Sequence, residues 1–212
     1  FTLDPGDDSN AVWSPDGSLI VYSCRDAGNK FTLSRKATTS TGIVEPLLNT
    51  TEDDFSTSDW SRDGKFILYT AQPLGGNGDL WALPLEGDRT PRPVVQTEHD
   101  EGGGRFSPDS RWIAYESDAS GRHEVYVAPF PGPGGTLQVS AGGGTEPRWR
   151  ADGKELFYFA SDNRLMAVEI TAEGESFEVG QVTPLFEARE TWMPGAGVRY
   201  DVTKDGQRFL VF

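Results

Sequence analysis

Cysteine is nearly absent from the 212 residues, and the single Cys24 excludes an intrachain disulfide. Cys24 follows the apolar run Leu19 to Tyr22, a position that favours a structural thiol in a strand over a reactive one. The longest apolar runs hold only a handful of residues, far below the roughly 20 that a helix needs to cross a bilayer. Helical periodicity is also lacking, so the sequence predicts an all-β chain.

Positive charge is scarce as well. Lys and Arg number 19 against 33 Asp and Glu, which gives a net charge of −14. Such a field repels a phosphate backbone, because nucleic-acid binding depends on Lys and Arg that replace counterions. The composition therefore argues against nucleic acid as a partner, and the acidic excess is expected first of all to form a solvated surface.

Residues that carry catalysis are few. The two histidines, His99 and His123, lie in different parts of the chain, and no Gly-x-Ser-x-Gly elbow, His-Glu-x-x-His helix or Walker loop occurs. A metal site built on histidine would need His99 together with Asp100 or Glu101. The sequence therefore predicts a chain that is not an enzyme, with a stand-alone enzyme centred on His99 as the alternative.

What the sequence does contain is a short motif, first seen as Val12 to Gly17, that occurs five times. Its second position is aromatic at residues 13, 60, 106 and 149 and is Val202 in the last copy, so successive copies are 47, 46, 43 and 53 residues apart. A period of about 40 to 50 residues is typical of propellers and solenoids. The 25 Gly and 14 Pro exclude a solenoid of helices.

Each repeat has the same order of strands and turns. An apolar strand follows the Asp-Gly turn, and a hairpin with Gly or Asn at its tip leads to a third strand, as in Glu124 to Pro129. A weaker fourth strand carries Pro46, Pro93 or Pro184, which suits a sheet edge because proline has no backbone donor. Four antiparallel strands per repeat form a propeller blade.

The sequence therefore predicts a single β-propeller domain over residues 1–212. We expect four full blades and a partial fifth, with residues 1–3 as a candidate extra strand, at about residues 10–49, 56–97, 103–141, 145–187 and 198–212. Two arrangements fit this count: a five-bladed ring with incomplete closure, or an arc of a larger propeller. Exposed blade edges in either arrangement would favour an oligomer.

The motif itself is interpreted as structural. Its aromatic residue is expected on the innermost strand of each blade, and core packing accounts for Trp13, Trp60 and Trp149. The turn aspartate can accept hydrogen bonds from nearby backbone donors. The structural turn residues are Asp16, Asp63, Asp109, Asp152 and Asp205.

The order aromatic-Ser-Pro-Asp-Gly, then the strand Trp112 to Asp118, then Glu124 to Val127, resembles the TolB-type, WD-like β-propeller repeat of bacterial periplasmic proteins. The ending Gly197 to Val211 is similar to the C-terminal propeller that follows the kinase domain and membrane helix in some bacterial serine/threonine kinases. The resemblance implies a protein-binding or sensor domain, a bacterial source and a periplasmic or extracytoplasmic location. No kinase signature occurs in this chain.

The loops that precede the innermost strands are acidic. A propeller gathers such loops on one face, where hard oxygen ligands could hold Ca²⁺ or receive a basic peptide. We interpret this face as the binding surface for a protein or peptide, with a plain solvated surface as the competing interpretation. The candidate binding residues are Asp8, Asp54, Asp100, Glu101 and Glu146, with Arg105, Arg148 and Arg199 as counter-charges.

A long loop precedes the last motif and explains the 53-residue step. It contains Trp192 and Met193, an apolar pair that could contact a ligand or pack over the channel mouth. No cofactor is predicted apart from Ca²⁺ at the acidic face, and no membrane contact is expected of the domain. The alternative function is a propeller that gates a hydrolase domain absent from this chain, as in prolyl-oligopeptidase-like proteins.

Overall fold

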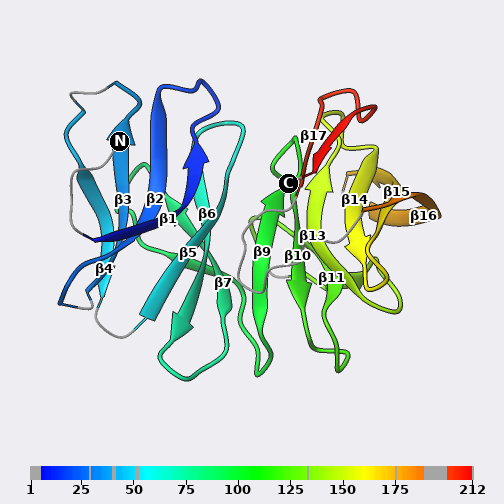
Figure 1. Ribbon diagram of the computed structural model, residues 1–212, viewed down its shortest axis with the longest axis horizontal. Helices are drawn as coiled ribbons and strands as arrows, with labels where there is room; N and C mark the ends of the chain where they lie inside the picture. Colours follow the sequence, from blue (N-terminus) through cyan, green and yellow to red (C-terminus); the bar gives the residue numbers. More distant parts are fainter. Residues whose placement is uncertain are drawn as a thin grey trace. The chain divides into compact units, whose positions relative to one another are not determined.

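The computed structural model describes residues 6–28, 30–39, 42–50, 53–132, 134–174, 176–188 and 200–211. These residues form strands and turns only, which confirms the all-β prediction (Figure 1). The chain divides into two compact units, Phe1–Gly104 and Arg105–Phe212. No helix within the described ranges is long and apolar enough to cross a membrane.

The first unit holds two four-stranded antiparallel sheets, each with its strands in sequence order. The first sheet consists of β1 (Asp7–Trp13), β2 (Leu19–Arg25), β3 (Phe31–Ala37) and β4 (Glu45–Thr50). The second consists of β5 (Asp53–Trp60), β6 (Phe66–Pro73), β7 (Asp79–Pro84) and β8 (Arg92–Val95). Pro46 and Pro93 lie on β4 and β8, which are edge strands as predicted.

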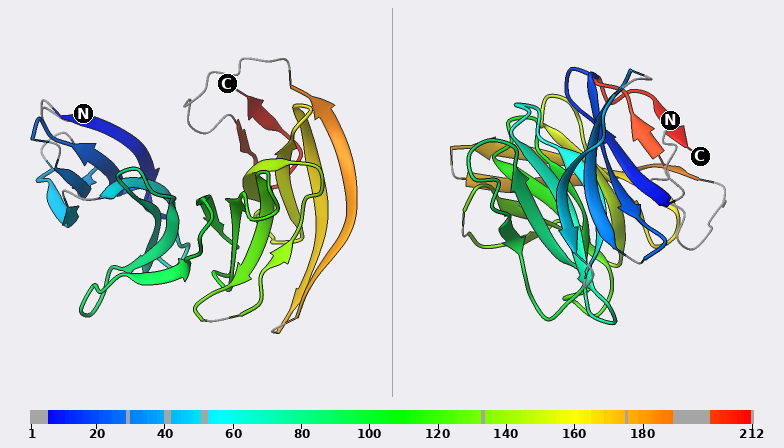
Figure 2. Two further views of the ribbon diagram at one scale, coloured as in Figure 1. Left: turned by 90° about the horizontal axis from the view of Figure 1, so that it is seen from below. Right: turned by 90° about the vertical axis from the view of Figure 1, so that its left-hand side faces the viewer.

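The second unit contains most of the third sheet and all of the fourth. The third has β9 (Glu101–Phe106), β10 (Trp112–Ser117), β11 (Glu124–Pro129) and β12 (Leu137–Gln138). The fourth has β13 (Gly144–Trp149), β14 (Glu155–Ala160), β15 (Arg164–Glu173) and β16 (Ser176–Glu187). Figure 2 shows the long β15–β16 hairpin in yellow and orange, and the red pair of β17 (Tyr200–Val202) and β18 (Phe209–Val211).

These sheets match the predicted blades closely, and the differences lie in the outer strands. The fourth strand expected in the blade at 103–141 is reduced to the two residues of β12. The fourth strand expected around Pro184 is extended to the twelve residues of β16, because β16 pairs with β15 over nearly its whole length. The fifth copy has the two strands expected of it, and residues 1–3 lie outside the described residues.

The turn of each motif is a closed hydrogen-bonded unit. In the first copy the Ser14 hydroxyl donates to Asp16 Oδ1 at 2.6 Å and accepts from the Leu19 amide at 2.9 Å. The same carboxylate accepts from the Ser18 amide at 3.0 Å. These hydrogen bonds, that from Ser14 first, lower the pKa of Asp16 from 3.8 to about 2. The turn is thus built by residues that lie within five positions of one another.

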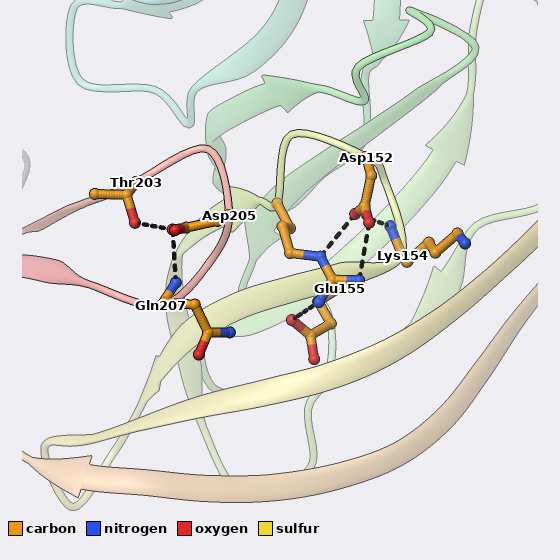
Figure 3. Close-up of polar contacts among 7 residues, drawn as sticks. Asp152, Lys154, Glu155, Thr203, Asp205 and Gln207 are labelled. Atoms are coloured by element: carbon orange, nitrogen blue, oxygen red, sulfur yellow. Dashed lines mark hydrogen bonds and ion pairs between the residues drawn. The ribbon is translucent and has the colours of Figure 1, made fainter.

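The other copies repeat this arrangement with one substitution. Ser61, Ser107 and Thr203 donate to Asp63, Asp109 and Asp205 at 2.7, 2.6 and 2.5 Å. In the fourth copy the Arg150 guanidinium replaces the hydroxyl and reaches Asp152 at 2.7 Å, while the Lys154 amide donates to the same carboxylate (Figure 3). All five turn aspartates therefore accept hydrogen bonds from residues of their own turns.

In the first unit, the aromatic residue of the second motif packs against the preceding blade. Trp60 is only 7% exposed and lies in a cluster with Val21, Phe31 and Leu33 of the first sheet. Trp13 is 61% exposed, so the prediction that it is a core residue is wrong. The physical reason is that Trp13 belongs to the first sheet of its unit, and no described strand stands before that sheet.

Candidate binding site

The acidic residues singled out in the sequence lie at the end of each blade where its innermost strand begins, which we call the acidic end. In the first unit, Asp8 is the second residue of β1 and pairs with Cys24, and Asp54 is the second residue of β5 and pairs with Gln72. Both carboxylates are exposed. The antiparallel pairing thus places each of them at the acidic end of its own sheet.

Asp100 is half-buried and has a structural partner. Its Oδ1 accepts a hydrogen bond from the Gly78 amide at 2.8 Å, which ties the loop before β9 to the start of β7. A side chain at Gly78 would collide with Thr70 and Asp100, because a Cβ there would lie 2.7 and 3.0 Å from their atoms. Asp100 therefore helps to shape the acidic end as well as to charge it.

Glu101 does not lie on the surface that the sequence suggested. Its side chain is 1% exposed, and its carboxylate accepts a hydrogen bond from the Thr97 hydroxyl at 2.5 Å. Its amide donates to the Gly78 carbonyl at 2.7 Å, which makes Glu101 the first residue of β9. The difference arises because successive side chains of a strand point to opposite faces, and that of Glu101 points inward.

Glu146 has an unusual backbone. Its φ is 56°, and it lies in the bulge that separates Thr145 from Arg148 in the pairing of β13 with β14. The same position, three residues before the motif aromatic, is held by Asn10 (φ 51°) and Gly103 (φ 62°). Asn and Gly accept this left-handed conformation readily, whereas a glutamate is strained in it. The strain identifies Glu146 as the distinctive residue of this repeat position.

Two polar contacts hold the Glu146 backbone in place. Its amide donates to Oε1 of Glu116 at 2.7 Å, and its carbonyl accepts from the Tyr200 hydroxyl at 2.9 Å. Tyr200 is fully buried, and burial raises its pKa well above the usual range, so the phenol remains a neutral donor. The Arg148 guanidinium lies 5.6 Å from the centroid of the Tyr200 ring, within cation–π range.

Burial raises the pKa of Glu116, and the nearby charge of Glu146 raises it further. The Glu146 amide, His123 and Arg148 act in the opposite direction. The second unit thus concentrates two carboxyl groups, an arginine and a buried phenol at its acidic end. Arg105 lies on β9, and its carbonyl accepts from the Trp149 indole at 3.0 Å.

The glycine run before β13 binds a carboxylate of the protein itself. The amides of Gly142 and Gly143 each donate to Glu124 Oε1 at 2.8 Å, and the Ser140 hydroxyl donates to Oε2 at 2.5 Å. Backbone amides arranged in this way form an anion-binding nest. Sequence reasoning missed Glu124, although its position at the start of β11, with a Gly-Gly-Gly run at the end of the same repeat, was a usable signal.

Three predicted site residues, Trp192, Met193 and Arg199, lie outside the described residues. The acidic ends of the first unit therefore carry Asp8, Asp54 and Asp100, and those of the second unit carry Glu116 and Glu146. Among the residues that the structure describes, no group of three or more His, Cys, Asp or Glu side chains is arranged to hold a metal ion.

No protein-family model matches the sequence, and no curated protein matches it. Solved structures do. TolB from Acinetobacter baumannii aligns with a TM-score of 0.72 at 20% identity over 96% of this chain and 48% of that one, so the chain spans about half of its length. The periplasmic gluconolactonase PpgL of Pseudomonas aeruginosa aligns with a TM-score of 0.61 at 16% identity over 94% of this chain and 63% of that one.

Prolyl oligopeptidase B from Galerina marginata is also similar, with a TM-score of 0.60 at 12% identity over 87% of this chain and 27% of that one. These likenesses are all at low sequence identity, and they concern the fold. They bring together proteins with different activities on one scaffold, which is common for widely used folds. The chain has the fold of TolB-like and related β-propeller proteins.

Proposed function

We propose that this chain is a non-catalytic binding propeller whose units receive a basic segment of a protein or peptide at their acidic ends. The net charge of −14 favours the approach of a cationic partner, because a field of one sign steers oppositely charged ligands. The exposed carboxylates of Asp8 and Asp54 stand where the innermost strands begin. The TolB-like fold supports a protein-interaction role at a coarse level.

Glu146 is the observation that carries the proposal. A glutamate occupies a left-handed bulge position where other copies use Asn10 or Gly103, and hydrogen bonds from its amide and to its carbonyl fix that backbone. Strained residues held by over-determined surroundings occur preferentially at binding sites. The left-handed backbone costs stability, so we assign the carboxylate of Glu146 to ligand recognition.

The test is binding of a fluorescently labelled oligoarginine peptide, followed by anisotropy at low and high salt. We expect binding that weakens with salt, and a loss of about five- to tenfold in affinity for Glu146→Gln, as for the removal of one partly screened charge. The matched control is Glu178→Gln, which removes an exposed glutamate from the outer strand β16. Equal effects of the two substitutions would reject the acidic end as the binding surface.

The same proposal places the domain as the sensor part of a longer bacterial protein, outside the cytoplasm. The similarity to the periplasmic gluconolactonase PpgL supports the location. A reading frame that encodes a kinase and a membrane helix upstream of this chain would agree with the sensor role.

A second candidate is a propeller that gates a hydrolase. The fold likeness to prolyl oligopeptidase B, of which the match covers 27%, favours it. A serine-hydrolase domain encoded downstream of this chain would support gating and contradict sensing.

A further inference from the structure

We propose that the face of the first sheet that carries Trp13 is an interaction surface for a second copy of this chain. The β17–β18 sheet of that copy would cover it in a head-to-tail contact. Trp13 is 61% exposed, and every other residue of β1 except Val12 is exposed as well. A tryptophan this exposed leaves a large apolar area in water, which favours association.

The first unit itself shows what such a face is built to contact. Trp60 holds the same motif position as Trp13 and is only 7% exposed, because the preceding sheet covers it. Its neighbours include Val21 of β2 together with Phe31 and Leu33 of β3. The natural cover for Trp13 is therefore a blade of this same repeat, presenting an aliphatic residue at the position of Val21.

The β17–β18 sheet presents such a residue. Leu210 lies four residues after the turn glycine Gly206, as Val21 lies four residues after Gly17. Its neighbour Phe209 points into the second unit, where its ring centroid is 5.1 Å from that of Phe157. Because strand side chains alternate, Leu210 points the other way, and it is 61% exposed. Trp13 and Leu210 are thus two exposed residues that could make the same contact that Trp60 makes with Val21.

Charge complements this fit. The groove between the first two sheets, about 510 Å³ in volume, is lined by Pro15 and Leu19 on one side and by Trp60 and Asp63 on the other. A groove of about 440 Å³ in the second unit has the equivalent lining, with Trp149 and Asp152 opposite the third motif.

In the proposed contact, the positions of Pro15 and Leu19 are taken by the exposed cations Lys204 and Arg208. The position of Asp63 is taken by Asp16 of the copy whose Trp13 is covered, and the carboxylate of Asp16 remains ionised because its pKa is lowered to about 2. Opposite charges therefore flank the apolar contact, and they favour the head-to-tail arrangement over head-to-head pairing of two acidic sheets.

Sedimentation equilibrium of the 212-residue chain over a range of concentrations tests the proposal. We expect reversible self-association, weakened by salt, and a loss of at least about tenfold in the association constant for either Trp13→Asp or Leu210→Asp. Both positions are exposed, so the circular dichroism of each variant should match that of the parent. The control is Leu74→Asp, an equally exposed site at 71% on the β6–β7 hairpin, which should associate normally.

Mixing the two variants separates head-to-tail from other contacts. Each variant retains the half-interface that the other lacks, so an equimolar mixture of Trp13→Asp and Leu210→Asp should form a 1:1 dimer that neither forms alone. A mixture that stays monomeric, or a Leu210→Asp variant that still self-associates like the parent, would overturn the proposal. So would a parent chain that sediments as a monomer at every concentration.

Discussion

The first two copies of the motif build the same turn, yet their tryptophans have different surroundings. The hydroxyls of Ser14 and Ser61 reach their turn aspartates at 2.6 and 2.7 Å, while Trp13 is 61% and Trp60 7% exposed. The turn depends on residues within a few positions along the chain. The tryptophan depends on a neighbouring sheet, so an identical motif contributes very different amounts of packing in the two copies.

The largest expected effect is on that packing. Trp60→Ala should lower the free energy of unfolding by about 3–5 kcal/mol, because it removes a large buried side chain and leaves a cavity. Trp13→Ala should change it by less than about 0.5 kcal/mol, as at an ordinary exposed site. Urea unfolding at concentrations where the chain is monomeric measures both. Similar losses for the two would show that Trp13 is covered within one copy.

The turns should behave alike in copies with different neighbours. Ser14→Ala and Ser107→Ala each remove a hydroxyl that donates to the turn aspartate and accepts from the amide that starts the next strand. Each substitution should lower the free energy of unfolding by about 1–2 kcal/mol. A much smaller loss for Ser14→Ala in the same urea experiment would mean that the turn also depends on a preceding blade.

At the bulge position of Glu146, we expect a substitution that raises the free energy of unfolding by a smaller amount. Glu146→Gly should raise the free energy of unfolding by about 0.5–1 kcal/mol, because glycine adopts a φ of 56° without strain. Asn10→Gly, at the equivalent bulge, should be nearly neutral because asparagine already tolerates this region. Thermal unfolding of the two variants distinguishes them. A destabilised Glu146→Gly would show that the side chain itself holds β13 together.

The smallest expected effect is on the pH dependence of stability. The pKa of Asp16 is about 2 in the folded chain against an ordinary 3.8, so its ionised form stabilises the fold above about pH 4. That contribution is lost as the pH falls through about 2. Asp16→Asn should therefore reduce the acid sensitivity of unfolding between pH 4 and 2 in a urea titration at each pH. An unchanged profile would contradict the assigned hydrogen bonds.

Much of the fold could be predicted from the sequence. The five motif copies, the period-two strands that follow them and the edge positions of Pro46 and Pro93 all agree with the structure. These features rest on turn chemistry and on strand periodicity, which act over a few residues. The predicted exposure of Glu101 and burial of Trp13 did not agree, because each depends on what lies across from the strand.

The candidate site was harder to predict for the same reason. Acidic loops at the start of the innermost strands were visible in the sequence, but the strained backbone of Glu146 and its contacts with Glu116 and Tyr200 were not. Tyr200 lies 54 residues from Glu146 along the chain. Contacts over such separations follow from the packing of sheets, which a single sequence does not display.

By itself, the sequence determined the repeat, the turn and the strand order of this protein, because hydrogen bonds between residues two to five positions apart close each turn. Only the tertiary structure decided which tryptophan is covered by a neighbouring sheet and which carboxylate accepts hydrogen bonds from distant backbone amides. Trp13 and Trp60 have the same local sequence role, and Glu124 lies 18 and 19 residues before the two glycines whose amides bind it. The burial of a side chain and its distant hydrogen-bond partners depend on how neighbouring sheets pack, and this packing is not visible in the local sequence.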